Sequence, residues 1–524
     1  MNELVEARAE LSRLEQKGQQ LLKELLDVRA ATDAQRTRID VLVRERGRTI
    51  ACLPTELLVW IFTLCIGPNS VGPDTMDQDV DMQRRQSAGV SRHWRDVILH
   101  SPILWNYIIM SPHHSPSLKT RLKRSYGAPL NILITGWWRP RIKGGLAKDL
   151  AIVIPYADRW SSLTIYGNSP ASMAFVINKV NHMKFPSLRH VVFHRVEDTS
   201  NAKSPCLDFL SPTCSPTLEH LVVRDFIPTL NLPTLSKLKT LDLMFENDIA
   251  ARVPSIFFVQ SLTTLSLIGD DSCWSLEQDS IQFPVLQTLI LHITDPNQFM
   301  EAIVAPVLDN FDFSTTSVDN PDSVAFSRLR NKFSAVRCLT FDLGDKLRGL
   351  DDTRGIAICQ AFPDVRRVEI YANDVQPIFA HSPKPGSQGC LLSSCNNLEL
   401  LVIRFSFPKW SRPEELHGID SLVEWLTGRI DSGQGRLRVK LSEIFEISDS
   451  VFTMIYNRLR KCCILELDDI PIELRIRLST SIHFPLRLIV PKATTELMDD
   501  IKQAFLTGNV LDSEGEMSQE DDEE

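Results

Sequence analysis

The amino-acid sequence predicts an α/β protein: a long N-terminal helix, a small all-α module, and then an irregular solenoid with a parallel sheet. Two observations carry this prediction. A short apolar pattern returns ten times between residues 150 and 470, and the first 48 residues lack proline and follow a heptad pattern. At 524 residues, 43% hydrophobic and 23% charged, the chain has the composition of a folded protein of several domains.

Residues 1–48 are predicted to form a coiled-coil helix. A heptad frame that starts at Leu4 places nine apolar residues among twelve a and d positions. These positions are Leu4, Ala7, Leu11, Leu14, Gly18, Leu21, Leu25, Val28, Thr32, Gln35, Ile39 and Leu42. Two arrangements stay open: coiling with a partner, including a homodimer through residues 1–48, and a long amphipathic helix folded back on the chain.

Residues 49–110 are predicted to form a helical module. Its first helix, LPTELLVWIFTLC at residues 53–65, is apolar on almost every side and carries Glu56 as its only charge. Such a helix must be buried on every side. It therefore lies deep in a large core, or its own domain covers one face and a partner covers the other.

An acidic segment at residues 67–83 separates the two halves of this module and is predicted as an exposed loop. Its Asp77-x-Asp79-x-Asp81 run looks like a calcium-binding loop. However, Met82 and Ala88 stand where such a loop requires glycine and a bidentate glutamate. In the second half, Val90, Trp94, Val97 and Ile98 recur at helical spacing, and Leu104-Trp105 follows.

Residues 151–490 are predicted to form the solenoid. Each repeat has the form apolar-x-x-apolar-x-apolar, and successive repeats start 20 to 33 residues apart, which leaves room for a strand and a short helix. The repeats start at Trp160, Leu188, Leu218, Leu238, Leu262, Leu286, Leu308, Val336, Val365 and Leu398. The alternative is a globular α/β domain whose strands are similar by coincidence.

Three further segments complete the predicted organisation. Residues 111–150 are a connecting unit with a helix, a turn at residues 127–129 and a strand. Residues 491–510 are a C-terminal helix, and residues 511–524 are a disordered tail with eight acids and no base. Removing these eight acids from the net charge of −9 leaves −1, so no strongly basic surface indicates nucleic acid.

The repeats resemble the leucine-rich-repeat family, although the polar residue that usually follows the strand occurs only as Asn168 and Asn373. Residues 53–107 resemble an F-box: Leu-Pro-x-Glu, an apolar helix, Val-x-x-x-Trp and a closing Leu-Trp, with a longer link between the halves. The F-box resemblance implies that this module binds a Skp-type adaptor, which bridges to a cullin–RING ubiquitin ligase. It assigns adaptor contact to Leu53, Pro54, Leu57, Leu58, Ile61, Phe62, Val90 and Trp94.

The pairing of an F-box with leucine-rich repeats implies a substrate receptor. The residues between the buried strand positions would line the open face of the sheet and bind a protein substrate. The candidates are Arg189, His190, Glu219, His220, Lys239, Arg366 and Arg367. Their mixed charges suit a protein or peptide better than nucleic acid, although each arginine could instead only solvate the sheet.

No catalytic residue, metal site or cofactor is predicted. The chain lacks the phosphate-loop, dinucleotide, zinc-protease and nucleophile-elbow motifs, and its cysteines have no zinc-site spacing. No apolar stretch is long enough to span a membrane, and the eleven scattered cysteines favour an intracellular location, in cytoplasm or nucleus. The remaining alternatives are a repeat scaffold that dimerises outside the ubiquitin system and an enzyme with an unrecognised site.

Overall fold

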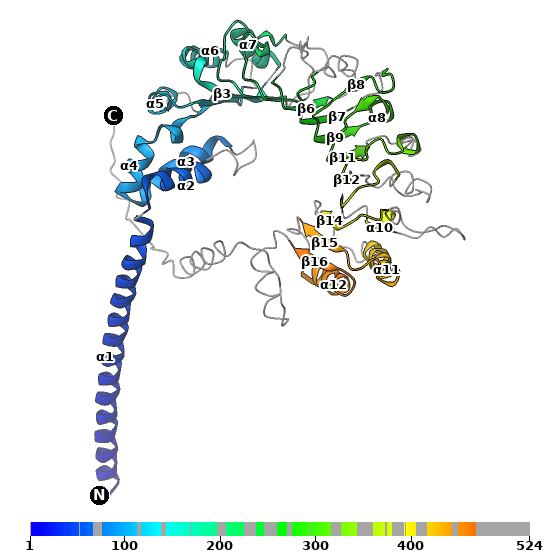
Figure 1. The fold of residues 1–524 in the computed structure, drawn as a ribbon. Helices are drawn as coiled ribbons and strands as arrows, with labels where there is room; N and C mark the ends of the chain where they lie inside the picture. The colour runs from blue at the N-terminus through cyan, green and yellow to red at the C-terminus, as the bar shows by residue number, and fades with distance from the viewer. Residues whose placement is uncertain are drawn as a thin grey trace. The chain divides into compact units, whose positions relative to one another are not determined.

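The fold is known from a computed structural model of the chain (Figure 1). It describes residues 2–51, 53–66, 76–112, 117–137, 143–168, 170–195, 206–224, 237–245, 259–269, 275–294, 296–315, 326–342, 360–371, 375–379, 392, 395–404, 417–442 and 449–467. The chain divides into two compact units, residues 1–308 with 315–317, and residues 309–314 with 318–524.

The first unit begins with helix α1 (Asn2–Ala51), which runs for 50 residues without a break. The predicted N-terminal helix is therefore confirmed. Proline is missing from this stretch and glycine is rare, so no residue forces an interruption.

A helical module follows, made of α2 (Thr55–Ile66), α3 (Met76–Val90), α4 (Arg92–His100) and the 3-10 turn η2 (Pro102–Trp105). Ser91 caps α4, because its Oγ accepts a hydrogen bond of 3.1 Å from the backbone N–H of Trp94. Helix α3 begins at Met76, so residues 76–83 of the predicted acidic loop are helical instead. The other residues of that loop, 67–75, lie outside the described residues.

Strand β1 (Tyr107–Met110) lies at the end of the range predicted as the helical module, and the connecting unit after it contains helix α5 (Leu118–Arg124) and strand β2 (Leu130–Thr135). Gly127 has a φ of +69° in the turn between α5 and β2, a conformation that glycine adopts without strain. Strand β1 was not among the predicted elements. It pairs in parallel with β2, so the sheet starts directly after the helical module.

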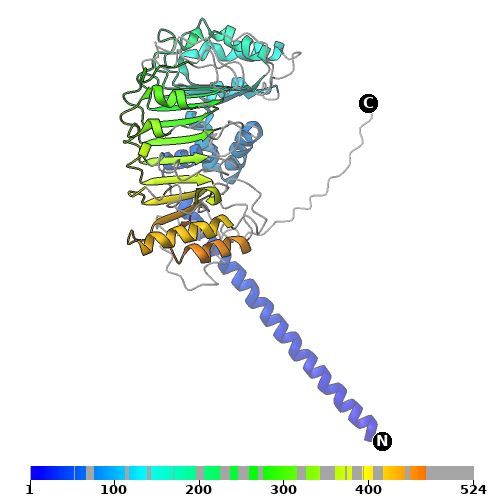
Figure 2. The same cartoon turned by 90° about the vertical axis from the view of Figure 1, so that its right-hand side faces the viewer.

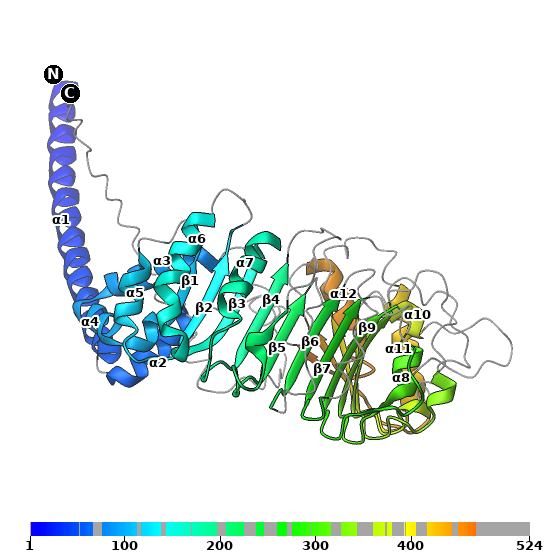
Figure 3. The ribbon, with the colours of Figure 1, turned by 90° about the horizontal axis from the view of Figure 1, so that it is seen from above.

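Six more strands continue the sheet in the first unit, side by side in chain order (Figure 3). They are β3 (Trp160–Asn168), β4 (His190–Arg195), β5 (His220–Arg224), β6 (Thr240–Phe245), β7 (Thr264–Gly269) and β9 (Thr288–Ile293). The connecting helices are α6 (Lys143–Val153), η5 (Ile154–Arg159), α7 (Pro170–Val180), η6 (Asp208–Leu210) and α8 (Asn297–Ala302). The short strands β8 (Ile281–Gln282) and β10 (Ile303–Val304) form a separate parallel pair.

The second unit repeats the same pattern. Its strands are β11 (Asn310–Thr315), β12 (Cys338–Asp342), β13 (Arg367–Tyr371), β14 (Leu400–Arg404), β15 (Arg438–Ser442) and β16 (Ile464–Leu467). Its connecting helices are η10 (Phe326–Leu329), α10 (Val375–Phe379), α11 (His417–Asp431) and α12 (Asp449–Leu459). Helices α11 and α12 lie side by side (Figure 2).

All ten predicted repeats contain a strand. With β1, β2, β15 and β16 these strands form a 14-stranded sheet in chain order, and every pairing described is parallel, as in an α/β solenoid-like fold. Alternate strand residues are buried: Leu163 and Ile165 in β3, like Leu221 and Val223 in β5, are fully inaccessible. The predicted helix at 491–510, the acidic tail and residues 468–490 lie outside the described residues.

Candidate functional site

Helix α2 has two apolar faces with different surroundings. Pro54 starts the helix, and its carbonyl accepts hydrogen bonds from the N–H groups of Leu57 (3.0 Å) and Leu58 (3.1 Å). One face, which we call the outer face, comprises Leu57, Trp60, Ile61 and Leu64 at i, i+3, i+4 and i+7. Its residues are exposed, from 37% for Ile61 to 63% for Trp60.

The opposite face of α2 belongs to the core of the helical module. Leu58 and Phe62 are each 1% exposed and pack in one cluster with residues of α4 and η2 and with Leu133 of β2. Trp94 packs edge-on against Phe62, with ring centroids 4.9 Å apart, and is half-buried. Leu58 and Phe62, predicted to contact an adaptor, therefore lie inside the module and position the outer face instead.

The other predicted contact residues are at the surface of the module. Pro54 is exposed at the start of α2, and Leu53 is half-buried and packs against the core cluster. Val90 is 63% exposed at the end of α3. Trp60 and Leu64 were not predicted as contacts, although their spacing from Leu57 and Ile61 marks the same helical stripe.

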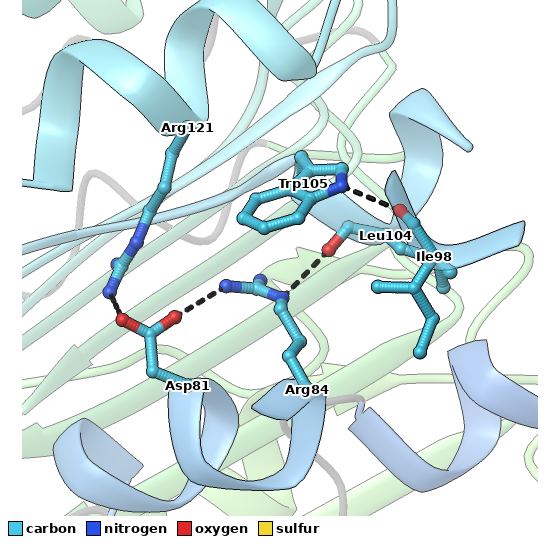
Figure 4. A network of polar contacts seen from close by, with 6 residues as sticks. All are labelled: Asp81, Arg84, Ile98, Leu104, Trp105 and Arg121. Carbon is cyan, nitrogen blue, oxygen red and sulfur yellow. Dashed lines mark hydrogen bonds and ion pairs between the residues drawn. The ribbon is translucent and has the colours of Figure 1, made fainter. Parts of the chain in front are cut away.

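A buried polar network fixes the module to the connecting unit (Figure 4). Asp81 on α3 forms ion pairs with Arg84, at 2.8 Å, and with Arg121 on α5. Arg84 Nε donates a hydrogen bond of 2.9 Å to the carbonyl of Leu104. Both arginines are buried, with 3% exposure for Arg84 and 1% for Arg121, so Asp81 compensates two charges that water cannot reach.

Trp105 of η2 packs beside this network. Its Nε1 donates a hydrogen bond of 2.7 Å to the carbonyl of Ile98, and the guanidinium of Arg84 lies 5.1 Å from its ring centroid (Figure 4). Burial lowers the pKa of Arg84 to about 10, against the opposing effect of Asp81. Arg84 therefore stays charged at neutral pH, and the three elements α3, η2 and α5 are held by one set of contacts.

The sheet of the first unit brings together five of the predicted substrate-binding residues. In the parallel pairing of β4 with β5, His190 lies opposite His220. Their rings stack at a centroid distance of 4.5 Å and an interplanar angle of 3°. Glu219 accepts a hydrogen bond of 3.2 Å from Lys239. This hydrogen bond from Lys239 is the main reason why the pKa of Glu219 is lowered, and the exposed Arg189 lowers it further.

The sheet of the second unit holds the other two, Arg366 and Arg367, at the start of β13. Arg366 forms an ion pair of 3.5 Å with Glu399. Arg367 forms one of 2.9 Å with Glu369, which is 5% exposed and also pairs with Arg404. These arginines are thus already paired, and an acidic ligand would have to compete with Glu399 and Glu369.

Two negative findings concern other kinds of site. Within the described ranges, no three His, Cys, Asp or Glu side chains are grouped so that they could hold a metal ion. Among the helices of those ranges, none has the length and apolar character needed to cross a membrane.

Comparison of the chain with protein-family models finds no matching family, and comparison with curated proteins finds no match.

Proposed function

We propose that the chain is the substrate-recognition subunit of a Skp–cullin–F-box type ubiquitin ligase. In this proposal the helical module is the F-box and its outer face on α2 binds a Skp-type adaptor. The leucine-rich-repeat-like sheet captures a protein substrate, and the chain itself is not an enzyme. The complex would act in the cytoplasm or the nucleus.

The observation that carries the proposal is the outer face itself. Four large apolar side chains stand exposed at i, i+3, i+4 and i+7 of one helix, and exposed apolar patches of this kind mark interaction sites. Trp60 is the most exposed of them, and tryptophan is the residue type most enriched among interface hot spots. The inner face is fully used by the core, so an adaptor can cover the outer face without unfolding the module.

The polar network supports a receptor role for a physical reason. A ligase subunit must hold its substrate at a fixed distance from the rest of the complex. The ion pairs of Asp81 join α3 to α5, and β1 and β2 follow directly, so the module is attached to the first strands by packing and not by a free linker.

The strand faces support a protein or peptide as the substrate. They mix His190, His220 and Glu219 with the half-buried apolar side chains Val192 and Val222. Phosphate-rich ligands need an excess of cations, whereas Lys239 on this face is already paired with Glu219.

The experiment is affinity capture of the full chain from cells with the proteasome blocked, followed by mass spectrometry. The proposal predicts that a Skp-type adaptor and a cullin are captured together with proteins that carry ubiquitin. The alternative, a scaffold that acts outside the ubiquitin system, predicts capture of partners with neither adaptor nor cullin. The same capture with Leu57→Asp/Ile61→Asp should lose adaptor and cullin and keep the substrates.

A further inference from the structure

Helix α1 exposes an apolar seam along its length. Every side chain described from residue 6 to 42 is solvent-exposed, including Leu14 (54%), Leu21 (56%) and Leu25 (59%). A helix of 50 residues is about 75 Å long. Most helices draw their stability from packing an apolar face, and here that face is open.

We propose that α1 pairs with α1 of a second copy of this chain in a parallel, in-register, two-stranded coiled coil. In such a dimer each a or d residue packs against the same residue of the other chain. Leucine then meets leucine at 14, 21 and 25, and the polar seam residues Thr32 and Gln35 meet polar copies of themselves. The dimer does not depend on the proposed function.

The seam residues argue against the antiparallel arrangement. With the two seams fully overlapped in opposite directions, Gln35 would face Leu11 and Thr32 would face Leu14. The Thr32 hydroxyl would stay bonded within its own helix, because it donates a hydrogen bond of 2.9 Å to the Val28 carbonyl. The Gln35 amide, however, would be buried against a leucine without a hydrogen-bonding partner, which is unfavourable. A polar layer at a single seam position is the usual device by which coiled coils select register and orientation.

Charges beside the seam add a smaller contribution. Glu24 is at a g position and Arg29 at the following e position, and both are exposed. In the parallel dimer each Glu24 faces the other copy's Arg29, so this pair forms twice. Glu10 is likewise at a g position and Glu15 at the following e position, so in the parallel dimer these two like charges would face each other. The polar layers therefore favour the parallel orientation more strongly than the charges do.

Parallel pairing has a consequence for the rest of the chain. Helix α1 ends at Ala51 and α2 begins at Thr55, and the three residues between them span at most about 10 Å. Both helical modules would therefore emerge at the same end of the coiled coil. If the proposed function holds, the dimer carries two adaptor sites and two sheet surfaces, and substrates with two recognition segments gain avidity.

Disulfide trapping in the full chain tests the orientation. Leu21→Cys, at a d position, should form an intermolecular disulfide under mild oxidation, whereas the control Lys23→Cys, on the opposite side of the helix, should not exceed the wild-type background. An antiparallel dimer would set position 21 against position 25. Cross-linking only between Leu21→Cys and Leu25→Cys chains would overturn the parallel arrangement.

Light scattering of the full chain tests the dimer itself. The wild type should have twice the mass of one chain, and Leu14→Asp/Leu21→Asp/Leu25→Asp should have the mass of one. The control Ser12→Asp/Gln19→Asp/Ala30→Asp adds the same charge away from the seam and should stay dimeric. A monomeric wild type, or a triple seam variant that remains dimeric, overturns the proposal.

Discussion

Asp81 and Arg121 are 40 residues apart in the sequence and form an ion pair that joins α3 of the helical module to α5 of the connecting unit. The Arg121 side chain is 2% exposed and the Asp81 side chain 21%, so the pair is largely withdrawn from water. The same carboxylate also pairs with Arg84. One acidic residue therefore compensates two buried cations at the junction between the proposed adaptor-binding and substrate-binding parts.

Removing this carboxylate should destabilise the junction strongly. Asp81→Ala leaves Arg84 and Arg121 buried without their shared partner, and breaking a buried pair in this way costs about 3–5 kcal/mol. Denaturant unfolding of the full chain should show this loss. Asp96→Ala, at an exposed position on α4, is the control and should change the free energy of unfolding by less than about 0.5 kcal/mol. Equal effects of both substitutions would show that the network contributes nothing.

The two faces of α2 should respond differently to truncation. Trp60→Ala removes an exposed side chain, so it should weaken adaptor binding by about 2 kcal/mol and leave folding unchanged. Phe62→Ala removes a core side chain and should cost about 3–5 kcal/mol of folding stability. Calorimetric binding and denaturant unfolding measure the two effects separately. A Trp60→Ala variant that unfolds early but binds normally would reverse the assignment of the faces.

His190 on β4, whose ring stacks on His220, should have a pKa below the ordinary range of histidine. Burial, and next the nearby His220, lower the pKa of His190 from 6.5, while Glu219 acts in the opposite direction. The folded state then binds fewer protons than the unfolded state, so this contribution to stability is present above pH 6.5 and is lost as the pH falls through the lowered pKa. His220→Asn should move the pKa of His190 back toward 6.5, as read by NMR titration of labelled histidine.

The neighbouring arginines of β13 should separate substrate capture from folding. Arg366→Glu alters an exposed ion pair with Glu399, so it should change stability by less than about 0.5 kcal/mol. Arg367→Glu sets a second carboxylate beside the buried Glu369 and should destabilise the unit. Arg366→Glu is therefore the variant to compare in substrate ubiquitylation with adaptor binding intact. Unchanged modification of every substrate would move the site away from this strand.

Local patterns predicted much of the fold because their causes are local. The alternation of buried and exposed residues in Leu221-Val222-Val223 is a property of a strand, and all ten repeated patterns gave strands. The heptad pattern over a stretch without proline likewise corresponds to one long helix. In contrast, the two stripes of α2 are both apolar, so spacing alone cannot decide which one meets the core. The structure places Leu58 and Phe62 in the core of the module.

Contacts between distant residues explain the other differences. The acids at 77, 79 and 81 favour a solvated loop when only their neighbours are considered. The partner that draws Asp81 inward is Arg121, which no local pattern links to it. The sequence did contain a local indication of a helix here, because Arg84 follows Asp81 by three residues and therefore lies on the same side of a helix.

The most direct test of the account is adaptor binding in a reconstituted system. The full chain and a purified Skp-type adaptor should form a one-to-one complex that survives gel filtration. Leu57→Asp/Ile61→Asp should abolish it while unfolding at the wild-type denaturant concentration, because both new carboxylates would be buried unpaired. The control Thr63→Asp/Gln86→Asp, which adds two acids at exposed polar positions of the same module, should bind as the wild type does. A wild-type chain that fails to bind, or a folded Leu57→Asp/Ile61→Asp chain that binds normally, would contradict the account.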